Sequence, residues 1–478
     1  MPIVKQTHWA AVVSILTLLL LPSAAYSHAF GSRYDLPLPL NFYLSAASIC
    51  VAISFLATFF LIRPEEKGSH QLEIRLNPAL CRFFSVLFQA TGLLLLILIL
   101  TSALIGDPSP TKNLATVTIW ILWWVGMLLF SALIINLWPQ LNPIYTIAQW
   151  INQRLPSQPR PLPQWLSYAS VIGLLFISWV ELVSNISETP IQLFYLIIIY
   201  LTSTCIFAHR YGIDTWFNNG DPLTRLFNLL GKMSPLCFTA RYSLIIRLPG
   251  SGLFIPKGEK PQIASTLFIL ALMSIVLFDG LSETPLWQAT LSYLTESQSL
   301  RPLLITLMNS GIDILSLLKT SGILIVFAVA AATYWLLSYS IWLVVKRQIP
   351  LHVISFRFAL SLMPIAIAYH FSHYISYLLL AGQLILPILS DPLGLGWNLF
   401  GTQAHRIDIS VINAENVWWI AVVSIITGHI ISAVIAHREA LRLFSDRKLA
   451  IQSQIPMMIL MILLTMSSLW ILSQPIVS

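Results

Sequence analysis

Two histidines and two carboxylates lie inside stretches of the sequence that are otherwise apolar. Glu181 occurs in ISWVELV, Asp279 in IVLFDGL, and His370 and His373 in IAIAYHFSHYISY. Histidines three residues apart share one face of a helix, so both imidazoles can point into one cavity. Imidazole nitrogens and carboxylate oxygens bind zinc and copper, and a bound metal ion turns water into a nucleophile at neutral pH. The sequence therefore predicts a divalent-metal site, for zinc or copper, at Glu181, Asp279, His370 and His373.

The same four residues also have a purely structural interpretation. The two carboxylates fall near the ends of apolar stretches, where they can face interfacial water or cap a helix, and the histidines can hydrogen-bond to neighbouring helices. The sequence contains no HExxH, GxSxG or DxDxG motif. The metal site is thus predicted from residue type and depth in the membrane alone.

Other polar residues extend this prediction in two directions. Asp391 and Asp35 are candidate acid/base groups beside the metal site. His429 and His437 lie towards the other membrane face and are candidates for a relay across the bilayer. Residues of the predicted extracytoplasmic loops that can close over the site are Asp35, Asp107, Glu283, Asp313, Asp391, His405 and Asp408.

The composition excludes a soluble globular domain. Hydrophobic residues make up 57% of the chain and charged residues only 9%, against about 25% charged residues in an average protein. The chain is therefore expected to have the lipid bilayer as its main solvent. Because the basic residues follow membrane topology, the net charge of +7 does not indicate nucleic-acid binding.

Residues 1–27 are typical of a secretory signal peptide. Lys5 precedes an apolar run over 10–21, and Ala25 and Ser27 stand at the −3 and −1 positions of a cleavage site. Cleavage there would make His28 the first residue, whose free amine and Nδ1 could bind one copper or zinc ion. The alternatives are an uncleaved first helix and a histidine that lies at the cleavage site by chance.

The remaining chain, 28–478, is predicted to be a single all-α domain, a polytopic bundle of about ten transmembrane helices. Twenty of the 26 Lys and Arg residues fall in alternate loops on one side and five on the other, so the positive-inside rule puts both mature termini on the extracytoplasmic side. The predicted spans are 40–62, 83–106, 115–138, 165–183, 191–209, 262–281, 320–345, 356–380, 417–436 and 455–473.

Three connecting segments are long. Loop 210–261 is predicted to be cytoplasmic, and its amphipathic run LTRLFNLLGKMSPL is expected to lie on the inner membrane surface. Loop 282–319 is predicted on the extracytoplasmic side, with LLITLMNSGIDILSLL as an interfacial or re-entrant helix. Loop 381–416 is predicted on the same side.

Several stretches resemble a known family in the same order along the chain. HAFGSRYDLPLPLNFYL, SWVELV, FDGLSETPLW, SHYISYLLLAGQ, SDPLGLGWNLFGT and HIISAVIAHREAL are similar to stretches of bacterial membrane proteins labelled fenitrothion hydrolase. The resemblance implies an integral protein of the bacterial cytoplasmic membrane that hydrolyses organophosphorus triesters. It departs from the family where SHYIS replaces AHYFS. The residues that fall in family-like stretches are His28, Arg33, Asp35, Glu181, Asp279, His373, Asp391 and His429.

Three functions remain open at this point. The first is a metal-dependent hydrolase whose small apolar substrate enters from the lipid. The second is a transporter or a copper-handling permease that uses the same residues, and the third is an assembly partner of another membrane subunit. A polar path from His373 to His429 would favour transport, whereas two separate clusters would favour the hydrolase.

Overall fold

The structure, a computed structural model, describes residues 38–61, 71–156, 158–239, 242–254 and 261–474. Within these residues, ten helical segments are long and apolar enough to cross a membrane. In chain order they are formed by α2 (Leu40–Leu61), α3 (Pro78–Ile105), α4 with η1 and α5 (Leu114–Thr116, Val117–Met127, Leu128–Leu133), η2 with α8 (Gln164–Tyr168, Ala169–Leu182), α9 (Pro190–Tyr211), α12 (Ile263–Ser282), α15 (Ile314–Val344), α16 with η4, α17, η5 and α18 (Leu351–Ala359, Leu360–Leu362, Met363–Ala381, Gly382–Leu384, Ile385–Ser390), α19 (Ala414–Leu443), and α20 with α21 (Arg447–Ser453, Ile455–Leu472).

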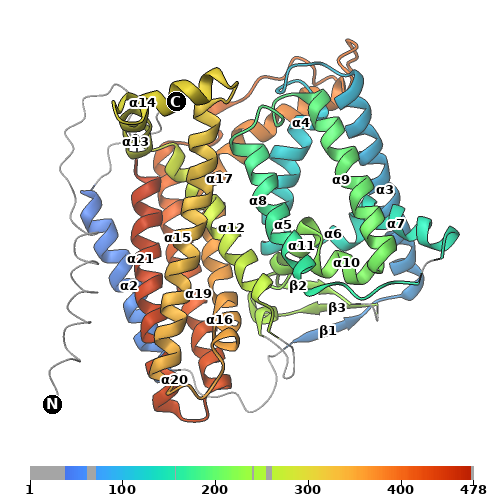
Figure 1. Cartoon of the computed structure of the whole chain (residues 1–478). Helices are drawn as coiled ribbons and strands as arrows, with labels where there is room; N and C mark the ends of the chain where they lie inside the picture. The colour runs from blue at the N-terminus through green and yellow to red at the C-terminus, as the bar shows by residue number, and fades with distance from the viewer. Residues whose placement is uncertain (1–37, 62–70, 157, 240–241, 255–260, 475–478) are drawn as a thin grey trace, which may run out of the picture. The chain divides into compact units, whose positions relative to one another are not determined.

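Short elements connect these segments. They are β1 (Leu72–Arg75), α6 (Trp138–Leu141), α7 (Pro143–Arg154), α10 (Ile213–Asn219), α11 (Pro222–Gly231), β2 (Leu236–Phe238), β3 (Ser243–Ile246), η3 (Ser251–Leu253), α13 (Pro285–Glu296), α14 (Arg301–Asn309) and η6 (Ile409–Val411). In Figure 1, α13 and α14 lie at one end of the long helices, and α20 and the strands lie at the other. The predicted all-α polytopic bundle of about ten spans is confirmed.

The helix boundaries follow local capping signals. Asn77 accepts a hydrogen bond from the Ala79 N–H where α3 begins, and Asp313 accepts hydrogen bonds from the N–H groups of Leu315 and Ser316 where α15 begins. Side-chain oxygens at this position satisfy backbone donors that the helix itself leaves unpaired. The hydrogen bonds from Ser316 keep the pKa of Asp313 below its usual value. Asp313 is thus a helix cap.

Helices α12 and α17 lie at the centre of the packing. In the apolar windows of Ile263–Ser282 and Leu351–Ser390, 78% of the residues are buried, against 6% for α3 and 11% for α15. Gly428 of α19 lets α17 approach closely, because a Cβ at Gly428 would lie 2.8 Å from the Pro364 carbonyl oxygen. Polar side chains on α12 and α17 therefore face protein rather than lipid.

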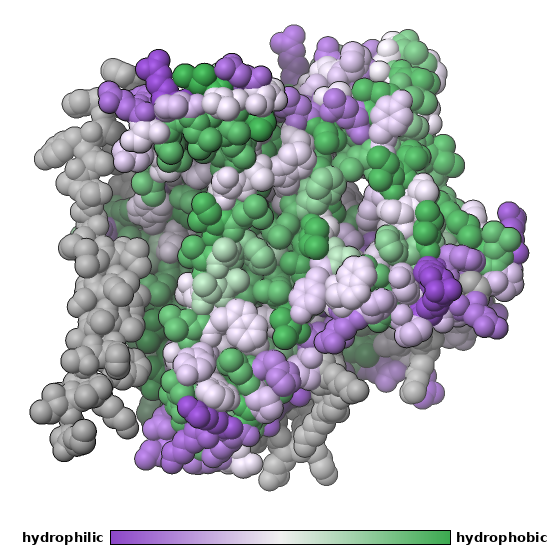
Figure 2. Space-filling model, in the orientation of Figure 1, coloured by the Kyte–Doolittle hydropathy of each residue, from purple (hydrophilic) through white to green (hydrophobic). Residues whose placement is uncertain are grey.

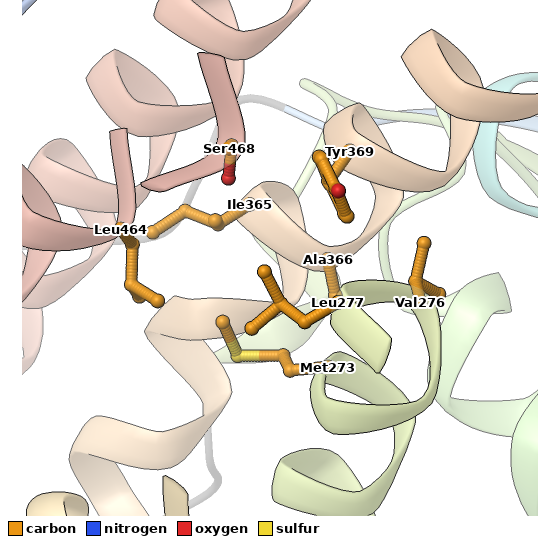
Figure 3. Close-up of a pocket in the computed structure, with 8 residues that line it drawn as sticks. All are labelled: Met273, Val276, Leu277, Ile365, Ala366, Tyr369, Leu464 and Ser468. Atoms are coloured by element: carbon orange, nitrogen blue, oxygen red, sulfur yellow. The ribbon is translucent and has the colours of Figure 1, made fainter. Parts of the chain in front are cut away.

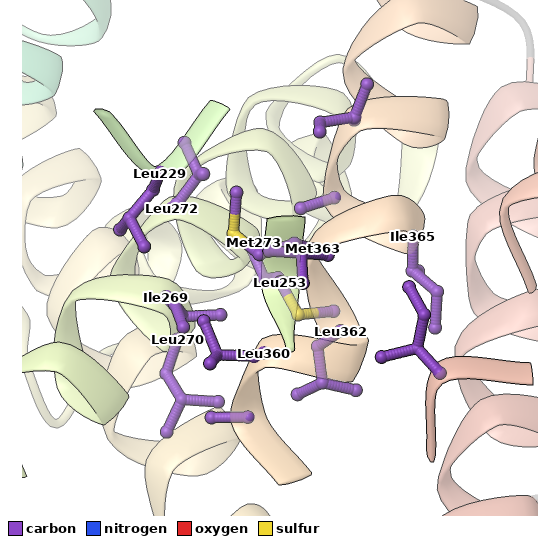
Figure 4. Packing of buried hydrophobic residues seen from close by; sticks show 14 of the residues in the cluster. Leu229, Leu253, Ile269, Leu270, Leu272, Met273, Leu360, Leu362, Met363 and Ile365 are labelled. Atoms are coloured by element: carbon purple, nitrogen blue, oxygen red, sulfur yellow. The ribbon is translucent and has the colours of Figure 1, made fainter. Parts of the chain in front are cut away.

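The core below these polar residues is apolar. Figure 4 shows leucine, isoleucine and methionine side chains packed together from α11, η3, α12, η4 and α17. Among them, Ile269 of α12 and Met363 of α17 are fully buried. Lipid tails are as apolar as these side chains, so close van der Waals packing, not removal from water, holds α12 against α17.

The outer surface matches a lipid environment. Figure 2 shows hydrophobic residues across the middle of the visible face and hydrophilic residues gathered towards its two ends. On α3, Phe83, Val86 and Ile97 are each at least 60% exposed. Apolar side chains exposed in such a band are expected of helices that face lipid tails.

The segment 210–261 differs from its predicted structure. The amphipathic run forms α11, whose Leu226, Phe227 and Leu230 are almost fully buried against α5 and α8. The prediction that this run lies on the membrane surface is therefore wrong, because its apolar face packs into the protein. The same region contributes β2 and β3 to an antiparallel sheet of order β1-β3-β2, which the sequence analysis did not predict.

Candidate metal site

The C-terminal end of α12 carries two carboxylates. Asp279 lies in the last turn of the helix, and Glu283 follows four residues later at its C-cap. Residues at this spacing are neighbours on a helix surface. Thr284 then begins α13, where its Oγ1 accepts a hydrogen bond from the Trp287 N–H. The turn between the two helices thus holds Glu283 close to Asp279.

Helix α17 supplies a stripe of imidazole and phenol side chains. His370, His373, Tyr374 and Tyr377 are three or four residues apart and share one face. The ring centroid of Tyr374 lies 4.6 Å from that of His370 and 4.7 Å from that of His373. Because His373 and Tyr374 both reach Asp279, this stripe faces α12.

Asp279 is held by two of these side chains through one oxygen. His373 Nε2 lies 3.0 Å from Asp279 Oδ2, and the Tyr374 hydroxyl donates a hydrogen bond to the same oxygen. Asp279 is only 8% exposed. Among the described residues nothing donates a hydrogen bond to Oδ1. The carboxylate is therefore anchored on one side and has its second oxygen available to a ligand.

The geometry of this group fits a metal ion. One ligand atom each from Asp279, Glu283 and His373 lies within 4.8 Å of the other two, the one such group of His, Cys, Asp and Glu in the described part of the chain. Ligand atoms bound to one tetrahedral zinc ion are about 3.3–3.4 Å apart, given bond lengths near 2.0–2.1 Å. The 3.0 Å between His373 Nε2 and Asp279 Oδ2 is a hydrogen-bond distance, so the two atoms need to separate by only a few tenths of an ångström to bind one ion. One imidazole and two carboxylates are a ligand set that zinc accepts.

A cavity of about 140 Å³ borders two of the three residues, Glu283 and His373. Both form part of its wall, together with Ser372, Ser376 and Val417. One water molecule needs roughly 10–15 Å³ of such space, so the cavity can hold several waters or a small organic group. The site thus combines a ligand set with room for a reactant.

A glycine makes this arrangement possible. Gly280, which also lines the cavity, faces α17 and α21. A Cβ at this position would lie 2.5 Å from the Tyr369 hydroxyl oxygen and 2.8 Å from Cγ2 of Ile471, closer than carbon atoms normally approach. The absence of a side chain therefore lets the three helices meet at the cavity.

Burial changes the acidity of Glu283, which lies just outside the spanning segment. Loss of hydration raises the pKa of its carboxyl group, the neighbouring His373 lowers it, and the charge of Asp279 raises it further. The net direction is upward. A carboxylate with a raised pKa is better suited to accept a proton near neutral pH.

Glu181 and His370 lie next to this group but are not part of it. Glu181 interacts electrostatically with Asp279 and accepts a hydrogen bond from Trp124, while its Oε2 is buried and has no hydrogen-bond partner among the described residues. His370 is 4% exposed, and both of its ring nitrogens are buried without a partner there. Of the four predicted ligands, Asp279 and His373 thus belong to the group and Glu181 and His370 do not.

Trp124 belongs to an element that the sequence analysis did not predict. Residues Val117–Met127 form η1, a π-helix of 11 residues, within the span predicted over 115–138. π-Helical turns are rare in proteins as a whole, and those that occur are often found at functional sites. Because the apolar pattern VTIWILWWVGM gives no sign of the change in helix type, only the tertiary structure reveals it.

The predicted acid/base residues lie elsewhere or outside the described chain. Asp391 accepts hydrogen bonds of 2.8 Å from the N–H groups of both Leu395 and Gly396. Its two oxygens stabilise the turn after α18, and it is not in the group around His373. Asp35 and the predicted ligand His28 lie outside the described residues.

The two histidines predicted as a relay lie in a different environment. His429 Nδ1 is 2.8 Å from the Ile425 carbonyl oxygen of its own helix, and His437 Nδ1 is 3.0 Å from Gln454 Oε1. Near His437, Glu439 forms ion pairs of 3.3 Å with Arg357 and Arg442. These residues form a second polar cluster, near α20.

Apolar side chains pack below the group formed by Asp279, Glu283 and His373. Figure 3 shows a small cavity between α12, α17 and α21, lined mainly by aliphatic side chains such as Val276, Leu277 and Ile365, with Tyr369 at one side. Its volume is about 10 Å³, close to the smallest space that one water occupies. Asp279 lies two residues after Leu277, so this small, mainly apolar cavity lies close to the metal site along α12.

Sequence reasoning named Glu283 only as one of several loop carboxylates. The spacing of four residues from Asp279 was the available signal, because α12 continues far enough to keep both on one face.

Comparison of the chain with protein-family models, with curated proteins and with solved structures gives no match.

Proposed function

We propose that this protein is a membrane-embedded, metal-dependent hydrolase with its site at the extracytoplasmic face of a bacterial cytoplasmic membrane. The observation that carries the proposal is the grouping of Asp279, Glu283 and His373 within 4.8 Å, of which Glu283 and His373 line a cavity of about 140 Å³. A ligand set with an open position for water is what metal-dependent hydrolysis requires.

The orientation rests on the distribution of basic residues. The cavity lies where α12 leads into α13, in the loop 282–319 that has few basic residues. Arg357, Arg442 and Arg447 lie near the opposite end, beside α20. By the positive-inside rule the cavity end faces out.

Each residue of the proposed site would have its own role in hydrolysis. A divalent ion held by the three side chains would lower the pKa of a water molecule and polarise the P=O or P=S bond of the ester. The hydrogen bond from Tyr374 fixes the Asp279 carboxylate, and Asp279 in turn orients the His373 ring. Glu283 would be the third ligand of the ion, and the proton that water loses would leave with the phenol.

The proposed substrate class is a small organophosphorus triester, as the resemblance to fenitrothion hydrolase implies. The water oxygen would bond to phosphorus, the bond from phosphorus to the aryl oxygen would break, and the phenol would leave with a proton. Apolar side chains in the cavity wall, Val417, Ile471 and Leu472, suit the organic groups of such an ester.

The separation of the two polar clusters supports hydrolysis over transport. His429 bonds only to its own helix among the described residues, and the space below Tyr369 is small and apolar. A permease would need an ion path between the membrane faces.

The test is release of the nitrophenol from fenitrothion by protein purified in detergent and loaded with Zn²⁺. Wild type should show activity that falls at least about 100-fold in His373→Ala and Glu283→Gln, since each removes a metal ligand. Asp391→Asn is the control and should remain active. Full activity in His373→Ala with the same protein yield would contradict the proposal.

A further inference from the structure

The cavity beside Glu283 and His373 has two kinds of wall. Polar residues line it from α17 and the C-terminal end of α12, and aliphatic residues line it from α19 and α21. The aliphatic residues are Val417, Ile471 and Leu472. A ligand that matches these walls is therefore apolar on one side and polar on the other.

The size of the cavity favours a single aromatic ring. Its volume is about 140 Å³, and an engineered protein cavity of roughly 150 Å³ binds benzene. The three organic groups of a triester do not fit together in such a space. Because Glu283 and His373 belong both to the cavity wall and to the metal-binding group, a ring in the cavity lies next to the metal position.

Two of the three hydroxyl groups on the wall already have partners. The Ser372 hydroxyl donates a hydrogen bond to the Ala368 carbonyl oxygen, and the Thr284 hydroxyl donates one to the Leu281 carbonyl oxygen. A hydroxyl group has one proton to donate. Neither side chain therefore has a donor left for a ligand.

Ser376 carries the third hydroxyl, which is uncommitted. It forms no hydrogen bond with any described residue, and its Oγ remains accessible. Ser376 lies three residues after His373, on the same face of α17, and lines the same cavity. Its hydroxyl can therefore donate a hydrogen bond to a ligand that the cavity holds.

We propose that this cavity binds the aromatic ring of the leaving group, a monocyclic phenol whose oxygen accepts a hydrogen bond from Ser376. The inference rests on the proposed function for the part of the ring in the reaction, whereas binding of a free phenol requires no metal. When water attacks phosphorus and the bond to the aryl oxygen breaks, negative charge develops on that oxygen. A hydrogen bond stabilises this charge until the oxygen takes the proton that water loses.

The experiment measures binding of two probes to metal-free protein in detergent by fluorine nuclear magnetic resonance. The probes, 4-fluorophenol and fluorobenzene, differ only in the hydroxyl group. We expect Ser376→Ala to weaken binding of 4-fluorophenol about 3- to 10-fold, as loss of one hydrogen bond does, and to leave fluorobenzene unchanged. Ser372→Ala is the matched control, because it removes a hydroxyl that already has a partner. It should bind both probes as wild type does.

A second variant tests the position of the ring. Val417→Phe puts a ring into the cavity from its aliphatic wall and should abolish saturable binding of both probes, with an unchanged thermal unfolding midpoint. Wild-type affinity of this variant for both probes would place the ligand elsewhere and overturn the inference.

The outcomes separate this inference from the proposed function. Hydrolysis of fenitrothion by a protein that binds neither probe, or whose Ser376→Ala variant binds 4-fluorophenol as wild type does, overturns the inference alone. Probe binding that depends on Ser376, in a protein that holds no zinc and hydrolyses no triester, overturns the proposed function and leaves a cavity for phenols.

Discussion

Two buried polar clusters occupy the same helical bundle and differ in how their charges are satisfied. Near α20, the carboxylate of Glu439 is fully buried, and each of its oxygens faces a guanidinium, from Arg357 and from Arg442, at 3.3 Å. Near α13, Asp279 is paired with His373, and among the described residues no lysine or arginine forms an ion pair with Asp279 or Glu283.

The clusters also differ in the space around them. The cavity of about 140 Å³ borders Glu283 and His373, whereas neither of the two cavities described here touches Glu439. A closed, paired cluster holds helices together. An open cluster with unbalanced charge is suited to bind a cation, since its acidic groups remain incompletely compensated.

The largest expected effect concerns the paired cluster. Glu439→Gln should lower the free energy of unfolding by about 3 kcal/mol, because it leaves Arg357 and Arg442 without their carboxylate. The thermal unfolding midpoint in detergent measures this change. Metal content should not change. A variant as stable as wild type would show that the ion pairs near α20 are not structural.

The next effect concerns the anchor of Asp279. Tyr374→Phe removes the hydroxyl that bonds to Oδ2, and loss of such a supporting hydrogen bond weakens metal binding about 10–100-fold. Competition with a chelator of known affinity measures it. Tyr377→Phe is the control, since Tyr377 lies on the same stripe without a hydrogen bond to any described residue. Equal losses in both variants would contradict the role of Tyr374.

A smaller effect is expected from crowding at the cavity. Gly280→Ala would force its Cβ against Tyr369 and Ile471 and should weaken metal binding roughly tenfold, as a misplaced ligand shell does. Gly382→Ala is the control, because the nearest atom to its Cβ is 3.9 Å away. The same chelator competition applies. Unchanged affinity in Gly280→Ala would mean that the close packing of α12, α17 and α21 does not support the site.

The smallest effect concerns a residue that the sequence analysis placed in the mechanism. Asp391→Asn keeps one oxygen as an acceptor for the turn at Leu395 and Gly396, so it should cost about 1 kcal/mol or less. Triester hydrolysis and metal content should be unchanged. Loss of hydrolysis with the metal retained would restore Asp391 as an acid/base group.

The spans could be predicted because bilayer thickness requires about 20 apolar residues for each helix. The segment around α17 exceeds its predicted length most, Leu351–Ser390 against 356–380. Others are also longer than predicted, such as Ala414–Leu443 against 417–436. The burial of α11 could not be predicted, because an amphipathic helix has the same sequence pattern whether its apolar face contacts lipid or protein.

The site was predictable only in part. Asp279 and His373 stood out because charged and titratable groups are rare at membrane depth. Their pairing across 94 residues depends on how α12 packs against α17, which no local pattern encodes. For the same reason, the sequence could not show that Glu283, unlike the other loop carboxylates, lies beside Asp279. It also could not show that Glu181 and His370 lie outside the group that contains His373.

The most direct test of the contrast between the two clusters is the zinc affinity of purified Asp279→Asn and Glu439→Gln, measured beside wild type. The structure predicts that Asp279→Asn loses zinc binding and keeps its thermal stability in the absence of metal, whereas Glu439→Gln keeps zinc binding and loses stability. Zinc binding by Asp279→Asn with wild-type affinity would contradict the assignment of the metal site.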